Sequence, residues 1–204
     1  MTIVMTPSVK PITKGQAGKF VDVAVDALVK SGLPSEPTQQ VLEEQGAALA
    51  DEFIGLVRKR VEAMSNIIVR RVKVNRNRAP QAMLDATGRT QYTNKSIVAA
   101  MPHGDGGEVE VVFFKLDRWV SDSDLDKEYA LRGLIPADPY SQGAVNETDP
   151  AFADDRPNGT HWKDAEGKYC YATFNRWSDE RGVNVYRNVS DWHDCWWFAG
   201  LRKK

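Results

Sequence analysis

The spacing of hydrophobic residues changes at residue 66, and this change constrains the fold more than any other feature of the sequence. From Ser35 to about Asn66, apolar residues recur at steps of three, four and seven, which predicts one long amphipathic helix. The next segment, Ile67 to Asn75, is rich in β-branched residues and predicts a strand. A chain that passes directly from a long helix into strands must combine helices with a sheet.

The helical part extends toward the N-terminus. Lys14 to Ser31 carries apolar residues on one helical face, and Gly32 then stands where a C-terminal cap belongs. Residues 1–13 show no periodicity and predict a mobile tail. The second helix, about 30 residues and roughly 45 Å long, either packs along a domain or forms a homo-oligomer interface through residues 36–66. We therefore predict an N-terminal tail and helical segment, residues 1–66, and an α+β domain, residues 67–204.

The remaining two thirds of the chain alternate between strand and turn patterns. Glu108 to Leu116 is apolar on both faces, which favours a central strand, and Ser121 to Arg132 predicts a helix. A turn with a short helix and then a long polar loop are expected over Pro136–Asn146 and Thr148–Gly159. Four short strands predict a C-terminal antiparallel meander: Thr160–Lys163, Lys168–Arg176, Val183–Arg187 and Cys195–Arg202. The expected fold class is α+β, with N-terminal helices packed on or next to a Trp-rich, mainly antiparallel sheet.

Composition excludes several classes of protein. Hydrophobic residues make up 42 % and charged residues 27 % of the 204 residues, which excludes collagen-like and wholly disordered chains. No run of 18 apolar residues predicts a membrane span, and the N-terminus lacks the pattern of a signal peptide. Two cysteines do not make a disulfide framework. We expect a cytoplasmic protein with no membrane partner.

Charge is unevenly distributed along the chain. Residues 58–78 contain eight Lys or Arg and one acid, whereas residues 120–166 contain eleven acids and four Lys or Arg. The basic block either pairs with acids inside the fold or between subunits, or binds the phosphates of a nucleic acid. If the block binds nucleic acid, the phosphate contacts fall in its strand part. We call this part the basic strand region, and it comprises Arg70, Arg71, Lys73, Arg76 and Arg78.

Aromatic residues concentrate in the C-terminal third. All six tryptophans lie at or after residue 119, and three of them fall within six residues. Adjacent residues on a strand point to opposite faces, so one of Trp196 and Trp197 is expected in the core. The other is either covered by the helices or available for base stacking, sugar stacking or a protein interface. The candidate binding surface therefore comprises Trp192, Trp196, Trp197, Arg187 and Arg202.

Histidines with nearby acids offer an alternative, a catalytic or metal site. His103, His161 and His193 each have an aspartate within three residues, and His161 and His193 could face each other across strands, with Cys195 close by. No spacing among them defines a metal or nucleophile motif. The favoured interpretation is therefore polar residues in loops, with no catalytic residues, metal or cofactor assigned.

Four segments resemble a group of short bacterial proteins described as uncharacterised. The similar segments are Asp85–Tyr92 (DATGRTQY), Glu108–Arg118 (EVEVVFFKLDR), Asp149–Asp164 (DPAFADDRPNGTHWKD) and Trp196–Lys203 (WWFAGLRK). The resemblance spans roughly residues 67–204 and implies a free-standing bacterial, cytosolic protein. It implies no functional residues.

These features together predict a non-enzymatic binding or accessory protein whose partner is nucleic acid or a nucleoprotein. One alternative is a protein–protein interaction or oligomerisation module that uses the long helix and the tryptophan surface. A second alternative is a small hydrolytic enzyme with a His/Asp site built from His161 and His193.

Overall fold

The computed structural model describes residues 11–203, which divide into two compact units, residues 11–65 and residues 66–203. The first unit consists of α1 (Lys14–Lys30) and α2 (Ser35–Ser65), as the periodicity predicts. Thr13 begins α1 with a capping box, because its side chain accepts from the Gln16 amide and the Gln16 side chain accepts from the Thr13 amide. Most of the predicted tail, residues 1–10, lies outside the described residues.

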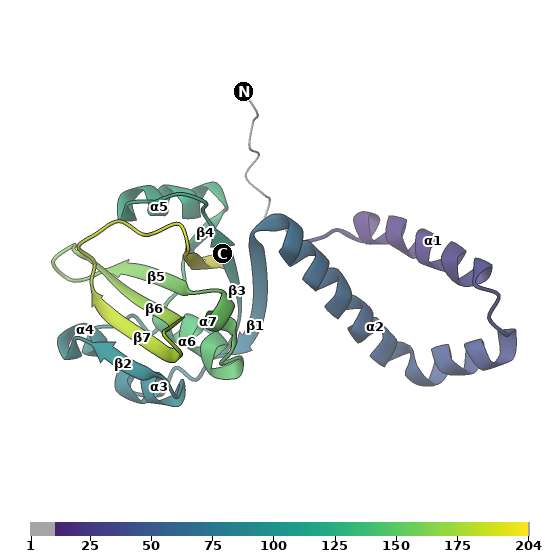
Figure 1. The fold of residues 1–204 in the computed structure, drawn as a ribbon, viewed down its shortest axis with the longest axis horizontal. Helices are drawn as coiled ribbons and strands as arrows, with labels where there is room; N and C mark the ends of the chain where they lie inside the picture. Colours follow the sequence, from purple (N-terminus) through teal and green to yellow (C-terminus); the bar gives the residue numbers. More distant parts are fainter. Residues whose placement is uncertain (1–10, 204) are drawn as a thin grey trace, which may run out of the picture. The chain divides into compact units, whose positions relative to one another are not determined.

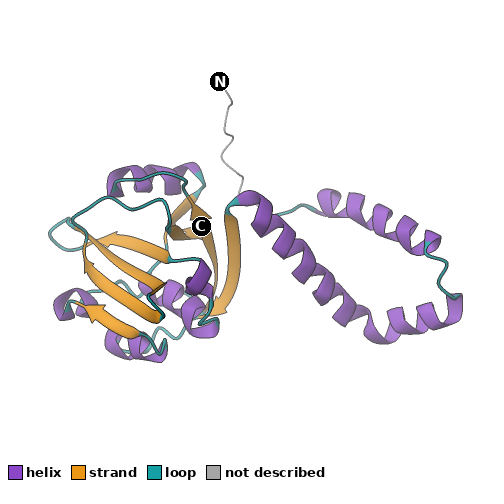
Figure 2. Ribbon diagram, viewed as in Figure 1, coloured by secondary structure: helices purple, strands orange, loops and turns teal. Residues whose placement is uncertain are grey.

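The second unit begins directly after α2. Asn66 adopts a positive φ of 42°, which ends the helix and turns the chain into the first strand. Eight strands and five helices follow among the described residues (Figure 2). The strands are β1 (Ile67–Lys73), β2 (Thr90–Thr93), β3 (Glu108–Lys115), β4 (Leu134–Pro136), β5 (Asn158–Lys163), β6 (Tyr169–Trp177), β7 (Glu180–Arg187) and β8 (Trp197–Arg202). The helices are α3 (Pro80–Ala86), α4 (Lys95–Ala99), α5 (Asp122–Leu131), α6 (Pro139–Thr148) and α7 (Phe152–Asp155).

The strands form one mainly antiparallel sheet in the order β1-β3-β8-β5-β6-β7-β2, with β4 paired to β8. The pairs β5–β8 and β2–β7 are parallel. The fold is therefore α+β, as expected, and β3 is a central strand between β1 and β8. None of the helices in residues 11–203 combines the length and apolar character needed to cross a membrane.

The C-terminal strands differ from a simple four-stranded meander. β5, β6 and β7 pair in chain order, but β8 lies between β3 and β5 instead of beside β7. Phe198 and Ala199 of β8 are both fully buried, so both faces of this strand favour a central position. Residues 188–196 carry the chain from the end of β7 back across the sheet, and this segment borders the candidate site described below.

The segment Thr148–Gly159 also differs from the expected polar loop. It contains α7, and β5 already begins at Asn158. Phe152 is buried against Phe113 with 4.8 Å between the ring centroids, which anchors this segment in the core. The Asn158 side chain bonds to Gln142 and Asn146 of α6, so burial and hydrogen bonding order a stretch that is polar in sequence.

The sheet separates two packed regions. On one face, the main core joins alternate residues of the strands to α3, α4, α6 and α7, and residues 139–146 of α6 are all buried. On the other face, α5 covers an aromatic group that includes Phe114, Tyr129 and Phe198. Within this unit, α5 lies at one end and α3 and α4 lie beside β2 at the other (Figure 1). The part of the second face over β6 and β7 contains the candidate site.

Candidate functional site

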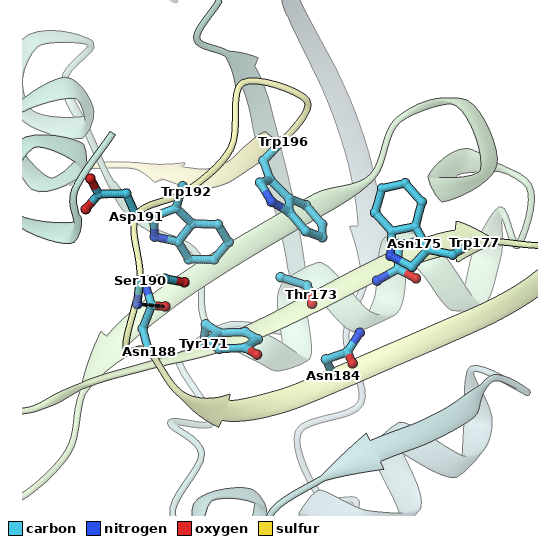
Figure 3. A pocket seen from close by; sticks show the side chains of 10 residues that line it. All are labelled: Tyr171, Thr173, Asn175, Trp177, Asn184, Asn188, Ser190, Asp191, Trp192 and Trp196. Atoms are coloured by element: carbon cyan, nitrogen blue, oxygen red, sulfur yellow. Dashed lines mark hydrogen bonds between the residues drawn. The ribbon is translucent and has the colours of Figure 1, made fainter. Parts of the chain in front are cut away.

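A pocket of about 260 Å³ opens over β6 and β7, beside the segment 188–196 (Figure 3). Every second residue of β6 from 171 to 177 lines it, because alternate side chains of a strand share one face. The intervening residues of β6, Cys170, Ala172 and Phe174, face the main core. We call this site the tryptophan pocket, and it is lined by Tyr171, Thr173, Asn175, Trp177, Asn184, Asn188, Ser190, Asp191, Trp192 and Trp196.

Aromatic rings form the walls of the tryptophan pocket. The Trp196 ring stands nearly perpendicular to Trp177 and to Trp192, with centroid separations of 6.2 and 5.9 Å. Tyr171 approaches Trp192 edge-on at 5.8 Å. Trp177 remains 53 % exposed, so an aromatic plane is accessible at the opening. This arrangement offers single aromatic faces to a ligand instead of a parallel pair of rings.

Polar side chains form the floor. Thr173 and Asn175 are only 3 % and 2 % exposed, and Asn184 lies opposite Thr173 in the β6–β7 register. Within residues 11–203, these three side chains have no hydrogen-bond partner, and none of their polar atoms is fully enclosed, so each is open toward the pocket. A hydroxyl and two amides therefore keep their hydrogen-bonding capacity for a ligand, and an amide offers both donors and an acceptor. The floor is therefore suited to hold a ligand that carries hydroxyl or amide groups.

Asp122, the first residue of α5, holds the border of the pocket in place. Its Oδ1 accepts hydrogen bonds from Trp192 Nε1 at 2.8 Å and His161 Nδ1 at 2.7 Å, and its Oδ2 accepts from Asn188 Nδ2 at 2.8 Å. Burial alone would raise the pKa of Asp122, but these hydrogen bonds outweigh burial and lower the pKa below its ordinary value. Asp122 is thus a positioning residue for two pocket residues.

Gly159 of β5 leaves the space that Trp192 occupies. A Cβ at this position would lie 2.6 Å from Trp192 Cζ3 and 3.1 Å from Thr173 Cγ2. The missing side chain lets the indole pack directly against β5, where Trp192 is nearly fully buried. Trp192 therefore serves as both a wall of the pocket and a part of the fold.

The three histidines lie in separate settings. His161 is 1 % exposed and interacts with Asp122 and Asp126, instead of the Asp164 that is near in sequence. Its Nε2 is 3.0 Å from Asp126 Oδ1 but lacks hydrogen-bond geometry. His193 pairs with Asp194 and packs on Trp119, whereas His103 stacks on Tyr140. Over the described residues, no three metal-binding side chains converge.

Cys195 lies two residues beyond His193 and is partly buried. Burial raises the pKa of its thiol, which disfavours the reactive thiolate. His161, one of the two histidines of the hydrolytic hypothesis, is enclosed by aromatic rings and aspartates. These groups instead link α5 to the segment 188–196.

The basic residues of the strand region interact largely within their own unit. Arg71 pairs with Glu110 at 3.0 Å, Arg76 with Asp138 at 2.8 Å and Arg78 with Glu147 at 2.6 Å. The Arg70 guanidinium lies 5.3 Å from the centroid of the Phe152 ring, and Lys73 is exposed. Asp138 and Glu147 belong to the acidic block 120–166, so internal pairing, the first of the two alternatives, accounts for part of the basic block.

The predicted aromatic surface is divided between pocket and core. Trp192 and Trp196 line the tryptophan pocket, whereas Trp197 packs against the main core, as expected for one of two adjacent residues. Arg187 pairs with Asp164, and Arg202 lies near Glu110. Neither arginine lines the pocket.

Sequence reasoning missed Trp177 and the polar floor. The alternation of Tyr171, Thr173 and Asn175 within the predicted strand Lys168–Arg176, continued by Trp177 just after it, is the signal for a polar and aromatic face. Comparison with protein-family models, with curated proteins and with solved structures gave no match.

Proposed function

We propose that this protein is a binding protein whose tryptophan pocket holds one ring of a neutral carbohydrate. The observation that carries this proposal is the pair of unpaired polar side chains on the pocket floor, Thr173 and Asn175, whose polar atoms face the pocket beneath aromatic walls. A sugar ring has C–H bonds on its faces and hydroxyl groups around its edge. The C–H face packs against an indole plane, and the hydroxyl groups pair with amides such as those of Asn175 and Asn184.

The charge of the pocket supports a neutral ligand. Among the ten residues that line it, Asp191 alone is charged, and it lies exposed at the border. A phosphate-bearing ligand would require Lys or Arg near its oxygens, because phosphate recognition depends on charge neutralisation. The perpendicular setting of Trp177 and Trp196 also favours stacking on one face over insertion of a flat base between two parallel rings.

Nucleic acid bound through the basic strand region is the competing hypothesis. It predicts that affinity falls steeply with salt concentration, since each neutralised phosphate releases counterions. The carbohydrate proposal predicts an affinity that changes little between about 50 and 200 mM salt. The two ligands are therefore separable by the salt dependence of binding.

The test uses the full chain on an array of neutral glycans, followed by calorimetric titration with the best oligosaccharide. Trp177→Ala should raise the dissociation constant about tenfold or more, because it removes an exposed stacking plane. Trp119→Ala is the matched control, since Trp119 is similarly exposed at 58 % but does not line the pocket. The control should bind as the unmodified chain does.

Two results would overturn the proposal. One is the absence of glycan binding, or an equal loss of affinity in both tryptophan variants. The other is salt-sensitive binding of a labelled oligonucleotide, with a salt slope that Lys73→Ala reduces by about one. That result would assign ligand binding to the basic strand region instead of the tryptophan pocket.

A further inference from the structure

The first unit exposes far more apolar surface than a free helical hairpin tolerates. No described side chain of α1 is buried, and six of its large apolar residues are at least 41 % exposed: Phe20, Val21, Val23, Val25, Leu28 and Val29. Lys19, Asp22, Asp26 and Lys30 are spaced by three or four residues, so they occupy a single face. From Phe20 to Val29 all the remaining positions are apolar, which is typical of a helix covered on more than one side.

α2 covers α1 only in part. Phe20 stacks on Phe53 of α2 with 4.6 Å between centroids, yet Phe20 is still 45 % exposed. α2 itself carries a further set of exposed apolar residues: Val41, Leu42, Leu49, Ile54, Leu56, Val57, Val61 and Met64. Monomeric soluble proteins rarely leave apolar surface of this extent uncovered, and helices gain most of their stability from packing an apolar face.

The charges of α2 identify what covers this surface. Residues 35–57 contain five acids and no Lys or Arg, whereas Arg58, Lys59 and Arg60 follow in its last two turns. Two parallel copies of α2 would place acids against acids. Two antiparallel copies place the acidic part of each against the basic end of the other, so the helix is complementary to itself in this orientation.

We propose that α1 and α2 pair with the same hairpin of a second copy of this chain and form a four-helix bundle. α2 runs antiparallel to the partner's α2, so the interface is two-fold symmetric. Apolar residues of α1 and α2 fill the centre of the bundle, and the charges of α2 select the orientation. This inference is independent of the tryptophan pocket and its ligand.

The test compares two charge-reversed full-length chains by sedimentation equilibrium. One chain carries Arg58→Glu, Lys59→Glu and Arg60→Glu, and the other carries Glu36→Lys, Glu43→Lys and Glu44→Lys. These six residues are exposed, so the substitutions remove no buried contact. Each variant alone should have a dimer dissociation constant raised about tenfold or more by like-charge repulsion. An equimolar mixture of the two variants should form a heterodimer and recover the affinity.

The mixing step distinguishes a charge-selected α2 interface from a general loss of stability in the two variants. If the unmodified chain is monomeric at all concentrations, or if neither reversal weakens the dimer, the proposal is wrong. Failure of the mixture to recover affinity would likewise contradict a charge-selected pairing of α2. A monomer that binds phospholipid vesicles through the same apolar residues would identify a lipid surface as the occupant and overturn the proposed dimer.

Discussion

At the scale of single residues, Asp122 has the most consequences for the candidate site. Three side chains donate hydrogen bonds to its carboxylate, and two of them, Trp192 and Asn188, line the tryptophan pocket. Ser121 caps α5 by accepting from the Asp124 amide, so the carboxylate sits at a defined helix start. A surface pocket thus depends on one partly buried charge beneath its border.

Replacement of Asp122 by Asn should destabilise the protein near neutral pH by about 1–3 kcal/mol, because an amide cannot accept all three hydrogen bonds. The pKa of Asp122 is lowered in the folded state, so its contribution exists above the ordinary value of 3.8 and is lost as pH falls below it. The difference in unfolding free energy between the two proteins should therefore shrink as pH falls below 3.8. Urea unfolding at neutral and acidic pH measures this, and a difference that stays constant with pH would contradict it.

At the scale of elements, the pocket results from β6 and from the long return to β8. β6 presents a core face and a pocket face because its residues alternate. The segment 188–196 crosses the second face because β8 pairs with β3 and β5 instead of β7. Gly159 of β5 permits this crossing by leaving room for Trp192. The pocket is thus a product of strand order as much as of residue type.

Gly159→Ala should displace Trp192 and disturb the pocket. The new Cβ would lie 2.6 Å from the indole, and overpacking of this kind costs about 1–3 kcal/mol. Gly107→Ala is the matched control, because a Cβ there meets no atom within 4 Å. Denaturant unfolding and tryptophan fluorescence should both change in the Gly159 variant and stay nearly constant in the control. Equal behaviour of the two variants would show that Trp192 repacks freely.

At the scale of the whole molecule, the two units differ in how they bury apolar residues. Residues 66–203 contain a core with many fully buried side chains, including Phe113, Phe174 and Phe198. In residues 11–65, no described side chain is buried. The stability of the second unit is therefore intrinsic to one chain, whereas that of the hairpin depends on its proposed partner.

Calorimetry of the full chain should show two unfolding transitions. The transition of the hairpin should move to higher temperature as protein concentration increases, because dissociation accompanies its unfolding. The transition of residues 66–203 should not depend on concentration. The variant with Arg58→Glu, Lys59→Glu and Arg60→Glu should lower the midpoint temperature of the hairpin transition alone. One cooperative transition that is insensitive to concentration would contradict this description.

Local patterns predict the elements well where each element has a clear period. The helices over 14–31 and 35–66 and the strands at 67–75 and 108–116 are confirmed to within a few residues. The predicted loop 148–159 is wrong in part, because Phe152 and Asn158 are ordered by distant partners. Of the residues that line the tryptophan pocket, sequence patterns predict Trp192 and Trp196 as part of a binding surface, but not Thr173, Asn175 or Asn184.

The sequence by itself determined the α+β class, the helical first third and the approximate positions of six of the eight strands in the described residues. These features follow from the period of hydrophobic residues, which a short stretch of sequence already shows. Tertiary structure alone decided which strands are neighbours, that His161 meets Asp122 and Asp126, and that three arginines of β1 and its following turn pair with acids. It also assembled the tryptophan pocket from β6, β7 and residues 188–196. These outcomes depend on contacts between residues far apart in the chain, and a local pattern gives the direction of a side chain but not the residue that it meets.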